Sequence, residues 1–350
     1  MGYNLSIEKI LPYEIIHFYD SKTLSYIASN SNKFYFKTDT GSEGKFSLPT
    51  NMLISIGKFF RPLRRFLRTD KSNAFFNYKK DGIVVIYSKS IFFFDLSRQT
   101  LKFCTSLADT RNILHMGEVV NNNAIIFGEY SSNKSRLGVP IWASYDDGKT
   151  WDIIYKFKSS SIKHIHGIYE DRFSDSLWIT SGDYDGECFL FEVPKGDFKK
   201  IIRHGDGSQK WRAVGLFFLE HEIIWAMDSH IQKSSIQIYN RKTKKLKTGM
   251  ELPGPVWYSK ELDDGKYLIQ TSVENGNGST VINANIYFST NCKDWQKVFT
   301  SEKDLWPMPY FKNGVISFAT GYQDSESFAF FSEGLIGIDG KSFLARVYEN

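Results

Sequence analysis

Two histidines separated by a single residue are the sharpest chemical feature of the sequence. They are His164 and His166 in the segment KHIHG. If this segment is a β-strand, both side chains point to the same face, about 6–7 Å apart along the strand. Together with His115 or Glu129 they could hold a divalent ion, because imidazole and carboxylate groups suit zinc, manganese or iron. Alternatively, one histidine acts as a general acid or base near neutral pH, or both bond to the backbone and are structural.

Arg212 is the candidate for binding an anionic group of a substrate. Its guanidinium group could form a bidentate pair with a carboxylate, which a lysine would do less well. The alternative is a structural ion pair with Asp183 or Asp228. The sequence leaves both interpretations open.

Further acidic and aromatic residues occur in the same parts of the chain. Besides the two histidines and Arg212, the candidate catalytic residues are Glu129, Asp183, Glu187 and Tyr258. The candidate substrate-binding residues are Trp211, Asp228, Trp257, Glu274, Trp306 and Tyr310. The tryptophans could stack on sugar rings, but aromatic residues on inner strands also fill protein cores, so a packing role is the alternative.

The composition favours strands as the elements that position these residues. The 350 residues include 29 Phe, 19 Tyr and 8 Trp but only 9 Pro. Aromatic side chains pack well on the pleated surface of a sheet. We therefore predict an all-β protein.

A unit of four short strands recurs along the chain. It is clearest at residues 211–250, where polar turns separate WRAVGLFFLEH, EIIWAMDSH, SSIQIYNR and KLKTGMEL. Units that recur every 40–50 residues or so are typical of β-propeller blades. We predict a single propeller over residues 1–350, with blades at 1–50, 70–107, 111–158, 163–203, 211–250, 255–300 and 305–350. Because the first 50 residues are poorly patterned, six blades plus an extension is the alternative to seven.

One segment departs from the strand pattern. In NMLISIGKFFRPLRRFLRTDK, apolar residues recur at near-helical spacing with arginines among them, which predicts a short basic helix near residues 53–68. Its basic face could contact an anionic membrane surface or polymer. The alternative is a helix between blades whose arginines are solvated.

The segment SYDDGKTW could hold paired catalytic carboxylates or form a structural turn. It falls between the third and fourth strands of its unit, and Ser144, Asp146, Gly148, Thr150 and Trp151 follow the pattern S-x-D-x-G-x-T-W. This pattern resembles the Asp-box of sialidases and other bacterial-neuraminidase-repeat propellers. In such a turn the aspartate accepts backbone N–H bonds, the glycine supplies a conformation that a Cβ atom would obstruct, and the tryptophan packs beneath. The acids of this segment are therefore expected to be structural.

A decayed copy of the same pattern, with Ser289, Asn291 and Trp295, occurs at the equivalent corner of the sixth unit. The resemblance implies a fold but no activity, since the superfamily includes hydrolases, lyases and binding proteins. The strands of a blade alternate in direction, so the starts of first strands and the ends of second strands meet at the rim opposite this corner. We expect an active site on that rim, where blades three to six bring the candidate residues together.

Sialidases of this superfamily use an arginine triad, a tyrosine–glutamate pair and an aspartate, with an FRIP segment near the start. The nearest segment here, FFRPLRR, lacks the isoleucine and lies in the predicted helix, so sialidase activity is not expected. The candidate rim instead carries His, Tyr, Arg and Glu, a set similar to that of propeller polysaccharide lyases. In those enzymes Arg or a metal neutralises a uronate carboxylate, and His or Tyr removes the C5 proton. We predict a lyase or hydrolase that cleaves or trims an acidic oligo- or polysaccharide; the alternative is a non-catalytic propeller that binds a glycan or a protein.

Charge and cysteine content limit the other possibilities. The formal net charge of +5 is small for this length, and the basic residues are scattered apart from the predicted helix, so nucleic acid is not an expected partner. Cys104, Cys188 and Cys292 lie far apart without a CxxC motif, which predicts reduced thiols. The chain shows neither a signal peptide nor an apolar run of membrane-spanning length, so we expect a cytoplasmic protein.

Overall fold

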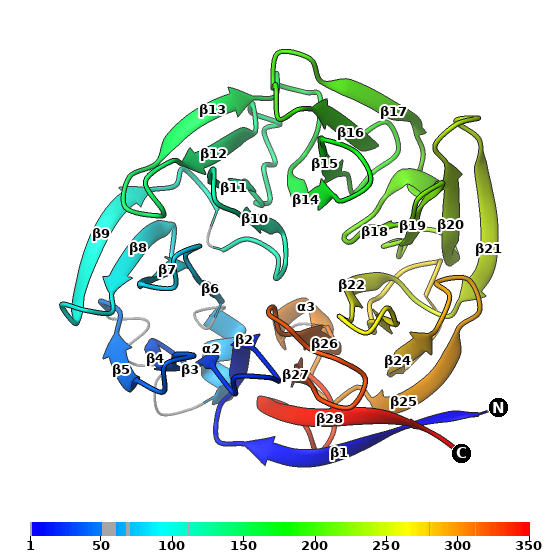
Figure 1. Cartoon of the computed structure of the whole chain (residues 1–350). Coiled ribbons are helices and arrows are strands. Elements are labelled where there is room, and N and C mark those ends of the chain that lie inside the picture. Colours follow the sequence, from blue (N-terminus) through cyan, green and yellow to red (C-terminus); the bar gives the residue numbers. More distant parts are fainter. Residues whose placement is uncertain (1, 51–60, 68–70, 111, 280, 312) are drawn as a thin grey trace.

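The strands form seven four-stranded antiparallel sheets arranged in a ring (Figure 1). The computed structural model describes residues 2–50, 61–67, 71–110, 112–279, 281–311 and 313–350. This arrangement is a seven-bladed β-propeller, so the predicted all-β class and the prediction of seven blades are confirmed. Within the described ranges, no helix has the length and apolarity needed to cross a membrane.

The first three blades each contain four strands that follow one another in the sequence, from the centre of the ring outward (Figure 1). Blade 1 contains β2 (Ile15–Tyr19), β3 (Tyr26–Asn30), β4 (Lys33–Lys37) and β5 (Glu43–Ser47). Blade 2 contains β6 (Ser72–Phe76), β7 (Gly82–Tyr87), β8 (Ser90–Asp95) and β9 (Thr100–Ser106). Blade 3 contains β10 (Glu118–Val120), β11 (Ile125–Gly128), β12 (Pro140–Ser144) and β13 (Asp152–Lys156).

Blades 4 to 6 repeat this order of strands. Blade 4 contains β14 (Ile165–Asp171), β15 (Ser176–Ser181), β16 (Cys188–Pro194) and β17 (Ile202–Gly207). After the short helix η1 (Gln209–Trp211), blade 5 contains β18 (Phe217–Phe218), β19 (Glu222–Ala226), β20 (Ser234–Asn240) and β21 (Leu246–Leu252). Blade 6 contains β22 (Val256–Glu261), β23 (Tyr267–Thr271), β24 (Asn283–Ser289) and β25 (Gln296–Glu302).

The seventh blade joins the two ends of the chain. Its inner strands are β26 (Val315–Phe318), β27 (Phe328–Glu333) and β28 (Lys341–Glu349), and its outermost strand is β1 (Tyr3–Leu11). The strand β1 runs antiparallel to β28, from the pair Tyr3 and Glu349 to the pair Leu11 and Ser342. The ring is therefore closed by backbone hydrogen bonds between the N-terminal and C-terminal strands.

This closure corrects the predicted boundaries of the first and last blades. Residues 3–11 belong to the last blade and not to a unit spanning residues 1–50. The segment 305–314, expected to be a first strand, contains the short helix α3 (Met308–Phe311) instead. Pro307 and Pro309 cannot donate to a strand ladder, and β1 already supplies the fourth strand of this blade.

Facing sheets of neighbouring blades bury most of the apolar side chains. All six residues of β7 are buried, whereas the outer strand β9 has none that is fully buried. Between blades 1 and 2, the ring of Phe46 stacks on Phe34 at 5.4 Å and on Phe94 at 4.1 Å between ring centroids. Such packing holds the blades rigidly and positions the loops around the central axis.

The helix α2 (Arg61–Leu67) lies within the predicted basic helix. Two of its arginines are buried, whereas the interpretation as a helix between blades expected solvated arginines. Arg64 and Arg65 are only 5% and 2% exposed. Arg64 pairs with Glu14 of the first blade, and Arg65 pairs with Asp304 at 2.6 Å on the connection between blades 6 and 7. These two arginines are used to attach the helix to the ring, because burying a guanidinium group requires a compensating partner. Residues 53–60 and 68 of the predicted helix lie outside the described residues.

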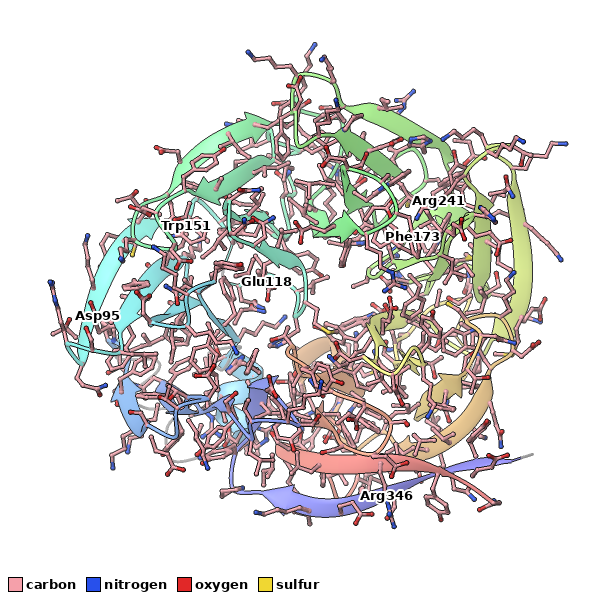
Figure 2. All side chains as sticks on the ribbon, viewed as in Figure 1. Asp95, Glu118, Trp151, Phe173, Arg241 and Arg346 are labelled. Atoms are coloured by element: carbon pink, nitrogen blue, oxygen red, sulfur yellow. The ribbon has the colours of Figure 1, made fainter. Side chains whose placement is uncertain are left out.

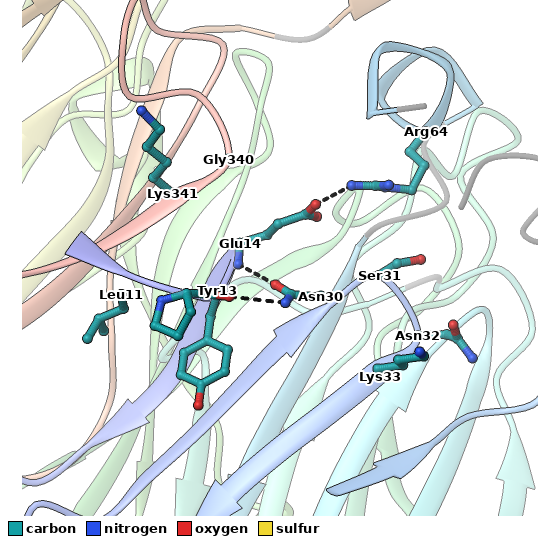
Figure 3. Close-up of a pocket in the computed structure, with 11 residues that line it drawn as sticks. Leu11, Tyr13, Glu14, Asn30, Ser31, Asn32, Lys33, Arg64, Gly340 and Lys341 are labelled. Carbon is teal, nitrogen blue, oxygen red and sulfur yellow. Dashed lines mark hydrogen bonds and ion pairs between the residues drawn. The ribbon is translucent and has the colours of Figure 1, made fainter. Parts of the chain in front are cut away.

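A cavity of about 640 Å³ lies beside α2, between the first and last blades. Figure 3 shows Glu14 directed toward Arg64 in this cavity, with Asn30, Lys33 and Lys341 also in its wall. The backbone N–H of Glu14 donates to Asn30 Oδ1 at 2.7 Å. None of the residues predicted to form the active site lines this cavity, so it is separate from the candidate site described below.

The turn at SYDDGKTW connects β12 and β13, the third and fourth strands of blade 3. Asp146 Oδ1 accepts hydrogen bonds from the backbone N–H groups of Lys149 and Thr150, and Trp151 Nε1 donates to the carbonyl oxygen of Gly148 at 3.1 Å. Gly148 has φ of 99°, and a Cβ atom there would lie 2.5 Å from a methyl group of Val84. The Asp146 carboxylate is thus engaged within the turn itself.

Candidate functional site

Two histidines and an aspartate converge at the inner end of blade 4. His164 directly precedes β14, His166 lies within it, and Asp183 follows β15. The Nε2 atoms of His164 and His166 are 3.1 Å apart, and Asp183 Oδ1 lies 3.3 Å from the first and 3.5 Å from the second. Both histidine side chains are almost completely buried.

A β-bulge brings the two imidazole rings closer than regular alternation would. In the pairing of β14 with β15, Ile165 opposes Ser181 and Gly167 opposes Thr180, so His166 is the extra residue. A bulge bends the strand locally and redirects its side chains. The ring centroids of His164 and His166 are consequently 4.9 Å apart, instead of the expected spacing along a straight strand.

Backbone carbonyl groups determine the tautomer of both histidines. His164 Nδ1 lies 2.7 Å from the carbonyl oxygen of Ser131, and His166 Nδ1 lies 2.8 Å from that of Ala213. A carbonyl oxygen only accepts hydrogen bonds, so each Nδ1 atom carries a proton and donates it. In the neutral rings, both Nε2 lone pairs then point toward each other and toward Asp183.

The Asp183 carboxylate is held by several positively charged or polar groups. Lys163 Nζ bonds to Oδ2, and Arg212 Nη2 lies 3.1 Å from Oδ1. Burial alone would raise the pKa of Asp183, but His164, His166 and Arg212 lower this pKa far below its usual range. Asp183 is therefore ionised near neutral pH.

Arg212 lies between two carboxylates, as in the ion-pair interpretation of the sequence. Its Nη2 atom is 3.1 Å from Asp183 Oδ1 and 3.0 Å from Asp228 Oδ2, and its side chain is nearly inaccessible to solvent. Burial raises the pKa of Asp228 to about 7, although Arg212 opposes this shift. Arg212 thus neutralises two buried carboxylates. It does not line the polar cavity beside the cluster, where a group that binds a substrate carboxylate would have to lie.

A polar cavity of about 370 Å³ opens onto this cluster. Its wall includes His164 and Asp183 from the cluster, together with Lys163 and Tyr130. The remaining lining residues are Lys71, Asp109, Asn112, Ser131 and Ser132. The cavity therefore presents one imidazole, two carboxylates and two lysine side chains to a small ligand.

Tyr130 and Lys163 belong to the site but were not predicted from the sequence. The Tyr130 ring lies over His164, with ring centroids 4.3 Å apart. Lys163 pairs with Asp183. Both were adjacent to predicted residues, because Lys163 precedes His164 and Tyr130 follows Glu129.

Glu129 and Glu187, predicted as catalytic acids, have other partners. Glu129 accepts hydrogen bonds from Thr110 Oγ1 and Trp142 Nε1, both at 2.9 Å. Glu187 pairs with Arg136 at 2.7 Å. Neither lines the cavity next to the histidines, so the structure does not bring these two acids to the reacting groups.

His115 is separated from the other histidines, which corrects the predicted metal ligand set. Its ring lies 5.6 Å from His17, 5.0 Å from Phe331 and 6.0 Å from Tyr258 between ring centroids. The first strand of blade 3 begins only at Glu118, and the preceding residues cross toward blades 1, 6 and 7. Burial lowers the pKa of His115 to about 3, so its imidazole is neutral and packed.

The predicted aromatic and acidic binding residues also separate into different environments. Trp211 belongs to a hydrophobic core cluster, with its ring centroid 5.4 Å from that of Trp225, so it has the packing role that the sequence left open. Trp257 Nε1 donates to Glu274 Oε2 at 3.3 Å. Trp306 is 45% exposed on the connection between blades 6 and 7. Of the two candidate tyrosines, Tyr258 is buried near His115 and Tyr310 stacks on Phe66.

Glu118 is a half-buried acid outside the cluster, on the innermost strand of blade 3 (Figure 2). Its Oε2 atom is inaccessible to solvent and has no hydrogen-bond partner. Burial raises the pKa of Glu118 to about 7. The folded protein therefore retains a proton that the unfolded chain releases above a pKa of about 4.3.

We expect Glu118→Gln to remove this source of pH dependence. In the wild type, the contribution of Glu118 to stability is complete below pH 4 or so and is lost as the pH rises through about 7. The variant should match the wild type near pH 4 and exceed its free energy of unfolding by about 3–4 kcal/mol at pH 8. Urea unfolding at the two pH values measures this difference, and an equal effect at both would contradict it.

No family model matches this sequence, and no curated protein sequence matches it. Solved structures, however, share the fold over nearly the whole chain. Streptogramin B lyase superposes with a TM-score of 0.58 and 12% identity, covering 99% of each chain. A catalytically inactive virginiamycin B lyase from Staphylococcus aureus with quinupristin gives the same values. A chain of the mitotic checkpoint complex gives a TM-score of 0.59 and 10% identity, covering 98% and 95% of the two chains. At such identities the similarity shows the propeller fold alone, on which both enzymes and members of protein assemblies are built.

Proposed function

We propose that this propeller is an enzyme that cleaves an acidic oligo- or polysaccharide at the polar cavity of blade 4. The observation that carries the proposal is the convergence of His164, Asp183, Lys163 and Tyr130 on one small cavity. Groups that move protons and groups that neutralise negative charge are both needed to act on a uronate, and both line this cavity. The shared fold supports an enzyme or a binding propeller equally, and the chemistry of the cavity is the reason for proposing an enzyme.

The residues of the cavity suit elimination better than hydrolysis. A lyase needs a cation beside the substrate carboxylate and a base beside the C5 hydrogen, and Lys163 and His164 can fill these roles. The electrons of the C–H bond then form the C4–C5 double bond as the C4–O bond breaks, and the departing oxygen takes a proton. Burial raises the pKa of Tyr130 well above its usual range, which keeps its hydroxyl protonated as a donor.

Hydrolysis would instead require two carboxylates at a defined separation with opposite roles. Asp183 is fully ionised by its cationic neighbours and cannot donate a proton. Asp109, the other carboxylate at the cavity, pairs with Lys89 at 2.9 Å. The paired state of both acids therefore favours the lyase over the hydrolase.

Incubation with a panel of uronate-containing oligosaccharides, followed by mass spectrometry of the products, tests this proposal. We expect unsaturated fragments that have not gained water, and about a 10²–10⁴-fold loss of rate in His164→Ala. His204→Ala serves as the matched control, because His204 bonds to Tyr239 and Glu192 outside the cavity. Fragments that have gained water would indicate a hydrolase. Binding of a glycan without any cleavage would support the non-catalytic alternative.

A further inference from the structure

Three atoms with unshared electron pairs face one another at the centre of the cluster. They are the Nε2 atoms of His164 and His166 and the Oδ1 atom of Asp183, separated by 3.1, 3.3 and 3.5 Å. Because both Nδ1 atoms donate to carbonyl groups, neutral rings have no proton to place between these three atoms. Such mutual repulsion is relieved by a cation bound among them.

The size of this triangle matches the coordination shell of a small divalent ion. Zinc binds imidazole nitrogen at about 2.0–2.1 Å and carboxylate oxygen at about 2.0–2.2 Å, which places tetrahedral ligand atoms about 3.3–3.5 Å apart. The observed separations of 3.1–3.5 Å therefore correspond to one face of a metal site.

The surroundings of the three ligands are those of a supported metal site. Metal-binding histidines commonly donate their second ring N–H to a backbone carbonyl, which sets the tautomer and the ring orientation. Here Ser131 and Ala213 accept these two bonds. Lys163 bonds to Oδ2 of the Asp183 carboxylate, while Oδ1 faces the two histidines and also lies 3.1 Å from Arg212 Nη2.

We propose that His164, His166 and Asp183 bind one divalent transition-metal ion, with its remaining coordination positions directed toward the cavity. Two imidazoles and one carboxylate favour zinc, iron or manganese over calcium or magnesium, which prefer oxygen ligands. His164 and Asp183 line the cavity, so water or a substrate oxygen can complete the coordination. Metal binding stands independently of the proposed lyase activity.

The metal also changes the division of roles in the proposed lyase. An ion bound at the three ligands would neutralise the substrate carboxylate and would occupy His164 Nε2. Tyr130, whose ring lies over His164 and which lines the cavity, would then carry the proton transfer in place of His164. Metal binding is measured by titration without substrate and the lyase activity by its products, so the failure of one proposal can be told apart from the failure of the other.

Metal binding by the full chain is measured first with chelator-treated protein, titrated with Zn²⁺ by calorimetry and with Co²⁺ by visible absorption. We expect one ion per chain, and binding at least about 100-fold weaker in His166→Gln and Asp183→Asn. His204→Ala is expected to bind as the wild type does. Circular dichroism and metal-free thermal unfolding establish that each variant is folded.

X-ray absorption of the zinc-loaded wild type gives a readout that does not depend on any variant. Two imidazole ligands at about 2.0 Å support the proposal. Absence of binding, or equal binding by the wild type and both ligand variants, would overturn it. In that case nitrogen NMR should find one of the two rings doubly protonated, with the proton shared between the Nε2 atoms.

Discussion

Replacing Arg212 by leucine is expected to lower the free energy of unfolding by about 3–5 kcal/mol. Arg212 is 4% exposed and lies within 3.1 Å of both Asp183 and Asp228. Leucine fills much of the volume but leaves two buried carboxylates without their shared counter-charge. The cost arises mainly from these unpaired acids and not from the loss of an attractive contact.

Chemical denaturation of metal-free protein measures this effect, and Arg172→Leu is the matched control. Arg172 also pairs with a glutamate, Glu261, at 2.6 Å, but its side chain is 54% exposed. A solvent-exposed ion pair contributes only about 0.2–1 kcal/mol, so the control should change little. Adding Asp228→Asn to Arg212→Leu should recover part of the loss. Equal effects of the two arginine substitutions would show that burial of Arg212 does not determine its contribution.

Removing residues 1–12 is expected to have the second large effect, because the ring would lose its closing strand. The strand β1 is hydrogen-bonded to β28 along its length, and Tyr3 packs on Phe288 with ring centroids 4.9 Å apart. Without it, β28 becomes an exposed edge with unpaired backbone groups. We expect the loss of most of the stability, which is about 5–15 kcal/mol for a folded domain, and an increased tendency to aggregate.

Complementation distinguishes lost closure from damage to the fold in general. A synthetic peptide of residues 2–12 should restore the thermal unfolding midpoint of the shortened chain, whereas a peptide with the same composition in scrambled order should not. Ile10→Lys is a mild control in the intact chain, because Ile10 is 59% exposed and such a surface change alters stability by at most about 0.5 kcal/mol. An unchanged midpoint in the shortened chain would show that β1 is not needed for closure.

The residue pattern was sufficient for those features that depend on neighbours in the sequence. Alternating apolar runs and polar turns predicted the all-β propeller and its seven blades, because six of the blades are built from consecutive strands. The turn around Asp146 and Gly148 could also be predicted, since its hydrogen bonds form within eight residues. The pair His164 and His166 was found for the same reason, since the two residues are separated by only one position at the start of β14.

Contacts between residues that are far apart in the sequence could not be predicted from the residue pattern. The pairing of β1 with β28 depends on where the ring ends, and the patterning of residues 1–50 contained no sign of it. His115 was grouped with the wrong histidines because the residues before β10 cross the centre of the ring instead of forming a strand. Even at blade 4, a bulge at His166 determines how closely the two rings approach.

The sequence by itself therefore determined the blades, the structural turn of blade 3 and a pair of histidines able to do chemistry, because short-range periodicity and turn residues encode all three. Only the tertiary structure decided that Asp183 lies beside the two histidines and that Arg212 is held between two acids. It likewise decided that Tyr130 and Lys163 line the cavity while Glu129 and Glu187 have other partners. The physical reason is that burial, charge pairing and ligand geometry depend on loops from several blades meeting at one point, which no local pattern records.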